Sequence, residues 1–339
     1  MANAAIADTP PPAPRLARPD ELPVIDLADV LAGRPGAVEA AAATLREACL
    51  RIGFFYVAGH GVPPDLVDRA FAGAASFHAQ PAAAKLALRI DRDNVGYMPM
   101  GAQTVVSTTV AVSRKASQNE AFFVKNEIGP EHPRFGRPFF GANRWPDGLP
   151  GFRETALAYM ARCNALAGTL LELYAVALGL PPDWFARHPG FREPGYRLRM
   201  SHYPPTPPEA DLYGLSAHTD YSFLTILAQS AVPGLEIRTR GGEWITAPSM
   251  PGTFLVNTGD MCMRMTNDRF VSTPHRVVNR TSAERYAIPF FFTSDAEVPM
   301  ETVPTCTGPD APPRYEPISH GDYFRMRINA NYHHQRTSA

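Results

Sequence analysis

Three consecutive residues, His218-Thr219-Asp220, place an imidazole and a carboxylate two positions apart. They open the run HTDYSFLTIL, which has the composition of a strand, and side chains at positions i and i+2 of a strand point to the same side. His275, in the strand-like run STPHRVVN, offers a third ligand from a second strand. The sequence therefore predicts that His218, Asp220 and His275 bind one metal ion.

Two neutral imidazoles and one carboxylate leave a divalent ion with net positive charge and about three open positions. This donor set is typical of non-haem Fe(II) sites, whose open positions admit a co-substrate and O2 together. Zinc is the competing metal, but hydrolytic zinc sites commonly use a helical H-E-x-x-H motif, which this sequence lacks. A second pair, His320-Gly321-Asp322, lies in SHGDYFRMRI, which is typical of a helix start. Asp322 is therefore predicted to be a helix cap or a first-turn carboxylate.

One arginine could lie beside this metal site. Arg285 follows His275 after the turn-like segment NRTSAE, so a hairpin could bring the two residues side by side. An ion pair with Glu284 or Asp295 is the alternative interpretation of Arg285.

The elements that must position these residues are predicted to form a single domain over residues 22–339, after a disordered lead-in of residues 1–21 that is rich in Ala and Pro. The part from 22 to 195 is predicted to be mainly helical. The part from 196 to 300 is predicted to be a β core that carries the metal ligands, and 301–339 is a C-terminal segment.

Helices are expected over 36–52, in two stretches between 63 and 90, and over about 150–179, where GLPPDW supplies a stop signal. From 94 to 148 the sequence is irregular. Beyond residue 195, short β-forming runs recur at regular spacing, and Gly241-Gly242 marks a two-residue hairpin turn. The pattern predicts an α+β chain that is mainly β: a sandwich, jelly roll or barrel with flanking helices and N-terminal strands that could complete a sheet.

The composition excludes several classes of function. Lys and Arg (32) nearly balance Asp and Glu (33), so neither a nucleic-acid partner nor an anionic membrane surface is expected. We find no apolar run long enough for a signal peptide or a membrane span. The four cysteines are scattered, which is typical of reduced thiols in an intracellular protein. We therefore expect a cytoplasmic protein with a small-molecule substrate, compatible with a monomer.

Several segments together resemble the Fe(II)- and 2-oxoglutarate-dependent dioxygenases of the isopenicillin N synthase-like family. They follow the family's order over about residues 22–330: LPVIDL, GFFYVAGHGV, NRWPDGLPGFR, HYPP, SAHTDYSFLTIL, VPGLEI, VNTGDM, STPHRVVN and ERYAIPFF. The resemblance implies a double-stranded β-helix (jelly-roll) core with a helical N-terminal region. It also implies Fe(II) bound by His218, Asp220 and His275, with 2-oxoglutarate as co-substrate and O2 as oxidant.

By the same resemblance, Arg285 would bind the distal carboxylate of 2-oxoglutarate. Tyr203 would assist, with a core aromatic residue as the alternative interpretation, and Ser201 stands where many relatives have asparagine. The family usually has Arg-x-Ser, whereas this chain has Ala287 at the last position, which removes a hydrogen bond worth about 1.5–3 kcal/mol to a charged group. This departure keeps open an oxidase of the isopenicillin N synthase type, which uses O2 without 2-oxoglutarate.

The expected reaction is oxidative decarboxylation of 2-oxoglutarate to succinate and CO2, coupled to hydroxylation of the substrate, with desaturation or cyclisation as further outcomes. A metal- or ligand-binding module without catalysis is the alternative outside enzymes, but a structural site is expected to close its coordination. Tyr221 and Phe223 are candidates for substrate contact or for core packing. Residues 94–125 and the C-terminal segment would supply the rest of the pocket, and the run RMRINANYHHQR could form a lid or a polar terminal helix.

Overall fold

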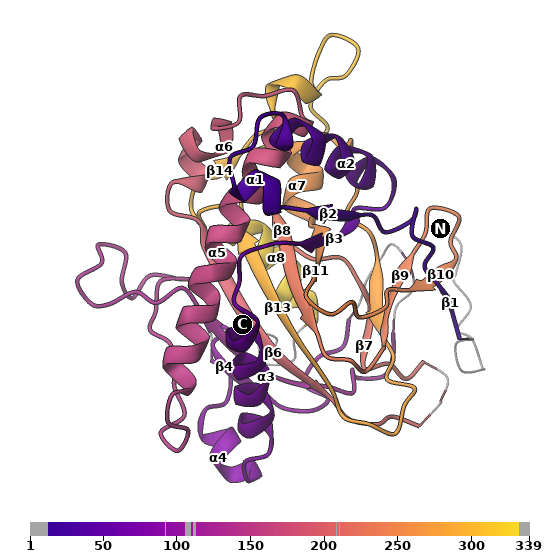
Figure 1. The fold of residues 1–339 in the computed structure, drawn as a ribbon. Coiled ribbons are helices and arrows are strands. Elements are labelled where there is room, and N and C mark those ends of the chain that lie inside the picture. The colour runs from indigo at the N-terminus through magenta and orange to yellow at the C-terminus, as the bar shows by residue number, and fades with distance from the viewer. Residues whose placement is uncertain are drawn as a thin grey trace.

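The structure is a computed structural model in which two β-sheets face each other. It describes residues 13–91, 93–105, 110, 113–207, 209 and 211–331, and for residues 329–331 it describes the backbone alone. The larger sheet has the strand order β2-β3-β11-β8-β13-β6-β5-β4, and the smaller has the order β1-β10-β9-β12-β7 (Figure 1). The strands of the larger sheet are β2 (Val24–Asp26), β3 (Phe54–Ala58), β4 (Gly96–Met98), β5 (Glu120–Lys125), β6 (Gly195–Tyr203), β8 (Leu224–Gln229), β11 (Phe254–Thr258) and β13 (Arg285–Thr293). The strands of the smaller sheet are β1 (Arg15–Leu16), β7 (Leu215–His218), β9 (Leu235–Arg238), β10 (Trp244–Thr246) and β12 (His275–Val277). A separate short pair joins β14 (Pro299–Met300) to β15 (Ile318–Ser319).

Helices cover the outer face of the larger sheet, with α3 and α5 lying across it and α2 packed on α5 (Figure 1). The helices are α1 (Ala28–Leu31), α2 (Ala37–Arg51), α3 (Pro64–His78), α4 (Ala82–Ala87), α5 (Phe152–Ala177), α6 (Trp184–Arg187), α7 (Asp260–Met265) and α8 (His320–Asn331). Two short 3-10 turns span Pro189–Phe191 and Pro304–Cys306. The predicted helices are confirmed, including the break at Pro81 between α3 and α4. The end of α5 is marked by Gly179, whose φ of +73° a glycine adopts without strain.

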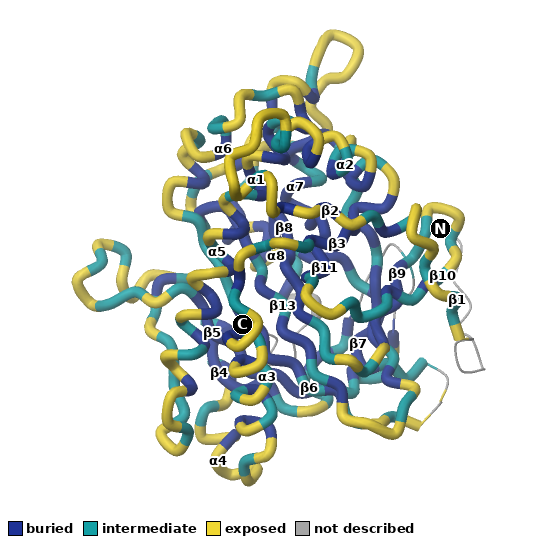
Figure 2. Tube along the Cα trace, viewed as in Figure 1, coloured by how far each residue is buried: buried dark blue, intermediate teal, exposed yellow. Residues whose placement is uncertain are grey.

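Alternation along two central strands separates a helix-facing core from a cavity between the sheets, because successive side chains of a strand point to opposite faces. The helix-facing residues are Leu198 and Met200 on β6, and Ile288, Phe290 and Phe292 on β13. The residues that face the second sheet are Arg199 and Tyr203 on β6, and Arg285 and Ala287 on β13. The strands of both sheets are largely buried, and exposed residues gather on the helices and connecting segments (Figure 2).

The larger sheet is completed by N-terminal strands, as predicted, since β3 pairs with β11 and β2 pairs with β3. Two further strands, β4 and β5, lie in the segment predicted to be irregular, and β5 pairs with β6. The hairpin of β9 and β10 is confirmed, but its loop runs over residues 239–243 and is longer than the predicted two residues.

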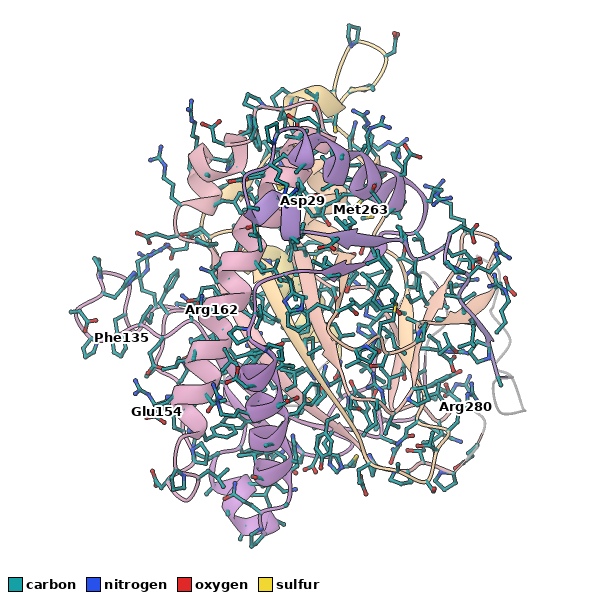
Figure 3. The ribbon with its side chains drawn as sticks, in the orientation of Figure 1. Asp29, Phe135, Glu154, Arg162, Met263 and Arg280 are labelled. Carbon is teal, nitrogen blue, oxygen red and sulfur yellow. The ribbon has the colours of Figure 1, made fainter. Side chains whose placement is uncertain are left out.

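The predicted disordered lead-in extends too far toward the C-terminus, because Arg15–Leu16 forms β1 beside β10. Arg15 pairs with Glu21 and with Glu243, at 2.7 and 2.9 Å, which fixes this strand to the smaller sheet. Charged side chains such as Glu154 and Arg162 on α5 are exposed to solvent (Figure 3). None of the helices in the described ranges is long and apolar enough to cross a membrane.

Candidate active site

The predicted metal ligands come together between the two sheets. Nε2 of His218 and Nε2 of His275 lie 3.8 and 3.7 Å from Oδ1 of Asp220. One ligand atom from each of the three residues lies within 4.8 Å of the other two. His275 and Asp220 are buried and His218 is half-buried. This arrangement can hold one divalent ion and leave its remaining positions open.

The three ligands converge for a different reason than the one predicted. The strand β7 ends at His218, and Asp220 lies in the turn that precedes β8, so the two are not on one strand. The two histidines are instead cross-strand partners in β7 and β12, where paired side chains are close neighbours. The turn then brings the carboxylate back toward both imidazoles.

A backbone carbonyl orients each imidazole. Nδ1 of His218 lies 2.9 Å from the carbonyl oxygen of Ser216, and Nδ1 of His275 lies 3.1 Å from that of Thr273. Since a carbonyl only accepts, Nδ1 carries the proton in each ring and Nε2 keeps its lone pair for a metal. Burial, together with repulsion from the neighbouring imidazole of His275, lowers the pKa of His218 to about 3. The His218 ring is therefore neutral and ready to coordinate at pH 7.

The second carboxylate oxygen of Asp220 is held by two donors. Oγ1 of Thr225 and Nδ2 of Asn257 donate to Oδ2 at 2.6 and 2.9 Å, which leaves Oδ1 for the metal. Burial alone would raise the pKa of Asp220, but the imidazoles of His275 and His218 and the two donors lower it below its usual value. This role of Asn257 was not predicted from the sequence. The one signal that could have indicated it is that Asn257 lies in VNTGDM, a segment that resembles the family.

The turn that carries Asp220 is fixed to the start of α7. The amide of Asp260 donates to the carbonyl of Asp220 at 2.7 Å, and the amide of Gly259 donates to that of Phe223 at 2.9 Å. A Cβ at Gly259 would lie 2.1 Å from the carbonyl oxygen of Ser222. Only glycine permits this close approach, so the residue before α7 determines how the turn is placed.

The same turn is joined to α8 through the carboxylate of Asp260. This carboxylate accepts hydrogen bonds from Thr219 (3.1 Å), Tyr323 (2.8 Å) and Arg327 (2.8 Å). Phe324 of α8 borders the cavity beside the metal ligands. The described part of α8 therefore closes one side of the site, whereas the rest of the predicted lid segment, residues 332–336, lies outside the described residues.

Arg285 borders the same cavity as the three ligands, but no hairpin brings it there. It begins β13 of the larger sheet, whereas His275 begins β12 of the smaller one, so the chain crosses between the sheets. Arg285 is 1% exposed, and its Nε and Nη1 have no hydrogen-bond partner among the described residues. Its guanidinium carbon lies 5.0 Å from the ring centre of Tyr203, its cross-strand partner. A Cβ at Gly234 would lie 3.0 Å from Cδ of Arg285, so the glycine leaves room for the arginine side chain.

The alternative ion pairs of Arg285 do not form, because Glu284 pairs with His202 and Asp295 pairs with Arg134. A fully buried guanidinium without a carboxylate partner is costly, since desolvation penalises the charge. Burial also lowers the pKa of Arg285, against the raising effect of Tyr203. The cavity therefore contains a cationic anchor that an acidic ligand can complete.

Ser201 and Ala287 are direct cross-strand partners on β6 and β13. They share the inward face with Tyr203 and Arg285. Ala287 borders the cavity, and Ser201 is fully buried with an Oγ that has no partner among the described residues. A hydroxyl is therefore present across the strand pair from the alanine that replaces the family's serine.

The two candidate substrate residues have different surroundings. Tyr221 borders the cavity on the side of the metal ligands that faces α8. Phe223 is fully buried and packs edge-on against Phe185 and Phe191, with ring centres 5.2 and 5.1 Å away. The candidate substrate contact of Phe223 is thus corrected to core packing, because the turn after Tyr221 directs this ring toward the helices.

The second His-x-Asp pair has the predicted helix-start geometry. Oγ of Ser319 lies 2.7 Å from Oδ2 of Asp322 and accepts from the Asp322 amide at 3.1 Å. Asp322 therefore stabilises the first turn of α8, as predicted. His320, however, is buried and borders the cavity near the metal ligands.

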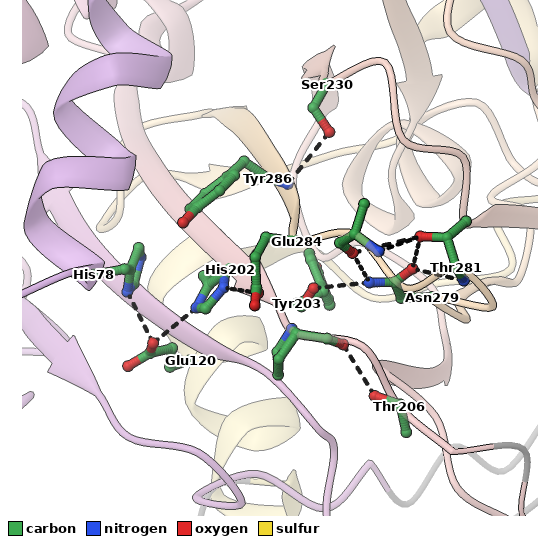
Figure 4. Close-up of polar contacts among 12 residues, drawn as sticks. His78, Glu120, His202, Tyr203, Thr206, Ser230, Asn279, Thr281, Glu284 and Tyr286 are labelled. Carbon is green, nitrogen blue, oxygen red and sulfur yellow. Dashed lines mark hydrogen bonds and ion pairs between the residues drawn. The ribbon is translucent and has the colours of Figure 1, made fainter.

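A second group of histidine and glutamate residues lies on the helix-facing side of β6 (Figure 4). Nδ1 of His202 and Nδ1 of His78 lie 2.8 and 3.5 Å from Oε1 of Glu120, and Nε2 of His202 lies 2.6 Å from Glu284. The ammonium of Lys85 lies 2.8 Å from the other oxygen of Glu120 and would repel a metal ion. Burial lowers the pKa of His202, but the hydrogen bonds to the two carboxylates raise it overall. We interpret this group as an ion-paired network that joins α3 and α4 to the sheet.

The geometry agrees with the comparisons to known proteins. Residues 194–294 match the family model of the 2OG-Fe(II) oxygenase superfamily. Residues 22–148 match a second family model, described as "non-haem dioxygenase in morphine synthesis N-terminal". The 2-oxoglutarate-Fe(II) type oxidoreductase hxnY of Emericella nidulans is 34% identical over 93% of this chain and 91% of its own.

Two solved structures are also similar. A full-length Neurospora crassa protein in complex with alpha-KG and thymine is 26% identical, with a TM-score of 0.80 over 93% of this chain and 98% of that one. JOX2 in complex with 2OG, Fe and JA is 28% identical, with a TM-score of 0.74 over 97% and 90%. The chain therefore belongs to the 2OG-Fe(II) oxygenase superfamily, with its jelly-roll core, and is an enzyme that uses Fe(II), 2-oxoglutarate and O2 to oxidise a substrate.

Proposed function

We propose that His218, Asp220 and His275 bind the Fe(II), and that Arg285 binds the distal carboxylate of 2-oxoglutarate with the help of Tyr203. The observation that carries this proposal is the buried guanidinium of Arg285, which lacks a carboxylate partner and borders the cavity of the three ligands. A carboxylate matches a guanidinium through paired, charge-assisted hydrogen bonds. Ser201 is proposed to contribute its free hydroxyl to the same end of the cavity.

When bound, Fe(II) with 2-oxoglutarate and O2 supplies the oxidation of a C–H bond, in which R–H, 2-oxoglutarate and O2 give R–OH, succinate and CO2. The side chains of His218, Asp220 and His275 would hold the metal through one ligand atom each. Thr225 and Asn257 keep the Asp220 carboxylate turned toward the metal position. The two sheets and α8 limit the access of water to the site. We propose hydroxylation as the outcome and Tyr221 as a substrate contact.

We further propose that the substrate is a small molecule rather than a nucleic acid, which the near balance of 32 basic and 33 acidic residues supports. Ligands named for similar structures, thymine for the Neurospora crassa protein and JA for JOX2, are small molecules. Cys49, Cys163, Cys262 and Cys306 are buried free thiols, which supports a reducing, cytoplasmic location.

The metal assignment is tested by anaerobic titration with Fe(II) and 2-oxoglutarate, in which the chelate gives a weak visible absorption band. The variant Asp220→Asn should lose metal affinity and the band. Asp322→Asn is the matched control, because it also lies two residues after a histidine but belongs to the first turn of α8. Equal metal binding by Asp220→Asn and the wild type would contradict the ligand assignment.

A further inference from the structure

A second buried guanidinium borders the cavity that contains the metal ligands and Arg285. Arg199 of β6 is 5% exposed, and its Nε and Nη2 have no hydrogen-bond partner among the described residues. It borders both the cavity that contains Arg285 and the cavity lined by Tyr221 and α8. Its guanidinium carbon lies 5.3 Å from the ring centre of Phe123, its cross-strand partner on β5. The ring supports one side of the guanidinium and leaves its polar edge unmatched.

The nearby Arg197 does not share this property. It lies on the same face of β6, two residues earlier, and donates to the backbone carbonyls of Asp93 and Asn94. Arg199 has no such acceptor within the described part of the chain. Among the described residues that line the cavity beside Tyr221, the only carboxylate is Asp220, a proposed metal ligand. An acceptor for Arg199 must therefore come from a bound molecule.

The remaining walls of this cavity indicate the rest of that molecule. Phe123, Phe291, Phe324 and Tyr221 form an apolar, mainly aromatic lining. His320 also borders the cavity, and its Nδ1 has no hydrogen-bond partner among the described residues. These surfaces suit a small apolar or aromatic body with one strongly acidic group.

Charge and geometry together favour an acidic group. Asp220 and bound 2-oxoglutarate bring three negative charges to the centre, whereas Fe(II), Arg285, Arg199 and Arg197, which also lines the cavity, bring five positive ones, and the imidazoles coordinate as neutral ligands. Burying a net positive charge is unfavourable, so an anion is favoured over an uncharged molecule. The two unpartnered donors of Arg199, Nε and Nη2, suit the two oxygens of one carboxylate.

We propose that the primary substrate is a small monocarboxylic acid with an apolar or aromatic body, anchored through its carboxylate by Arg199. This inference rests on the proposed function, because it places the substrate in the cavity next to the metal position. The carboxylate would hold one end of the molecule at β6, and the body of the molecule would lie in the same cavity as His218 and Asp220. Arg199 selects the substrate, and Arg285 selects the co-substrate.

The test is isothermal titration of the Mn(II)-loaded protein, saturated with 2-oxoglutarate and kept free of O2. The probes are benzoate, phenylacetate and 3-phenylpropionate, each paired with its primary amide, together with phenyl phosphate and thymine. At least one acid should bind tenfold or more tightly than its amide, and more tightly than phenyl phosphate or thymine. Saturating 2-oxoglutarate excludes binding of the probes at Arg285.

The variant Arg199→Gln should raise the Kd of the preferred acid by about 10- to 100-fold. Its affinity for 2-oxoglutarate should change less than threefold. Arg199→Lys keeps the charge and should retain part of the acid affinity, which separates charge loss from misfolding. Arg187→Gln, an exposed arginine paired with Asp183, is the matched control and should bind like the wild type.

Three results would overturn the inference: equal binding of every acid and its amide, preferred binding of phenyl phosphate or thymine, or unchanged acid binding in Arg199→Gln. Loss of 2-oxoglutarate affinity in Arg199→Gln would also overturn it, and would assign Arg199 to the co-substrate. If the wild-type, metal-loaded protein did not bind 2-oxoglutarate at all, the proposed function itself would fail. The two failures are therefore distinguishable.

Discussion

Replacing Thr225 by valine should weaken metal binding about tenfold and leave the fold intact. Valine has nearly the same shape as threonine and is also β-branched, so it fits β8. It cannot donate the 2.6 Å hydrogen bond to Oδ2 of Asp220. Removing a group that orients a metal ligand typically costs about 10–100-fold in metal affinity.

For Thr225→Val we expect a loss of metal affinity near the lower end of that range, because Asn257 still donates to Oδ2 of Asp220 at 2.9 Å. The double variant Thr225→Val/Asn257→Leu frees the carboxylate to rotate and should approach a 100-fold loss, or about 2.7 kcal/mol. Losing a donor also raises the pKa of Asp220 relative to the wild type. Since a metal needs the ionised carboxylate, the affinity of the variant should begin to fall at a higher pH as the solution is acidified.

The assay is calorimetric titration with Mn(II), repeated at several pH values, with thermal unfolding as the check on folding. The matched control is Thr258→Val on β11. Its hydroxyl lies 3.2 Å from that of Tyr174 and 3.3 Å from Sγ of Cys49, on the helix-facing side of the sheet. Thr225→Val with unchanged metal affinity, or Thr258→Val with the same loss, would refute the reasoning.

Three further predictions address other parts of the molecule. Arg285→Gln should raise the Kd for 2-oxoglutarate about 10- to 150-fold, since hydrogen bonds to a charged group are worth about 1.5–3 kcal/mol, while Mn(II) affinity measured without 2-oxoglutarate stays unchanged. His202→Gln should lower the free energy of unfolding by about 1–3 kcal/mol at pH 6. The pKa of His202 is raised in the folded protein, so the stabilisation that its charge provides is fully present below the unfolded-state pKa of 6.5 and is lost as the pH rises through the folded-state pKa. Urea unfolding should therefore show a smaller difference in the free energy of unfolding between His202→Gln and the wild type at pH 9 than at pH 6. Phe223→Ala should cost about 3–5 kcal/mol in urea unfolding, with unchanged 2-oxoglutarate affinity per folded molecule; a selective loss of ligand binding without destabilisation would return Phe223 to the site.

Much of the site could be predicted from the sequence because its chemistry depends on residue types that are informative by themselves. His218, Asp220 and His275 form a metal-binding set in any fold that brings them together, and Arg285 is suited to bind a carboxylate wherever it is buried. The routes by which they meet could not be predicted. A turn carries Asp220, and a crossover between sheets carries Arg285, and neither has a periodic pattern of its own.

Arg199 shows a different limit of the sequence. In YRLRMSHY, arginines alternate with Leu198 and Met200, which is also the pattern of a strand with one face in solvent. Only the presence of a second sheet and of α8 over that face turns the charged positions into cavity walls. For the same reason β4 and β5 were missed, since their burial depends on neighbours that are distant in sequence.

The two faces of β6 and β13 make the pairing register of these strands essential to the enzyme. On one face Tyr203 is paired with Arg285 beside the metal ligands; on the other, His202 stacks on Tyr286 with ring centres 4.9 Å apart and bonds to Glu120. A slip of one residue in a strand exchanges its faces. It would place the arginine against the apolar helices and the ion-paired histidine beside the metal. The network behind the sheet therefore supports the proposed co-substrate site without belonging to it, because it stabilises the one register in which both guanidinium groups face the cavity.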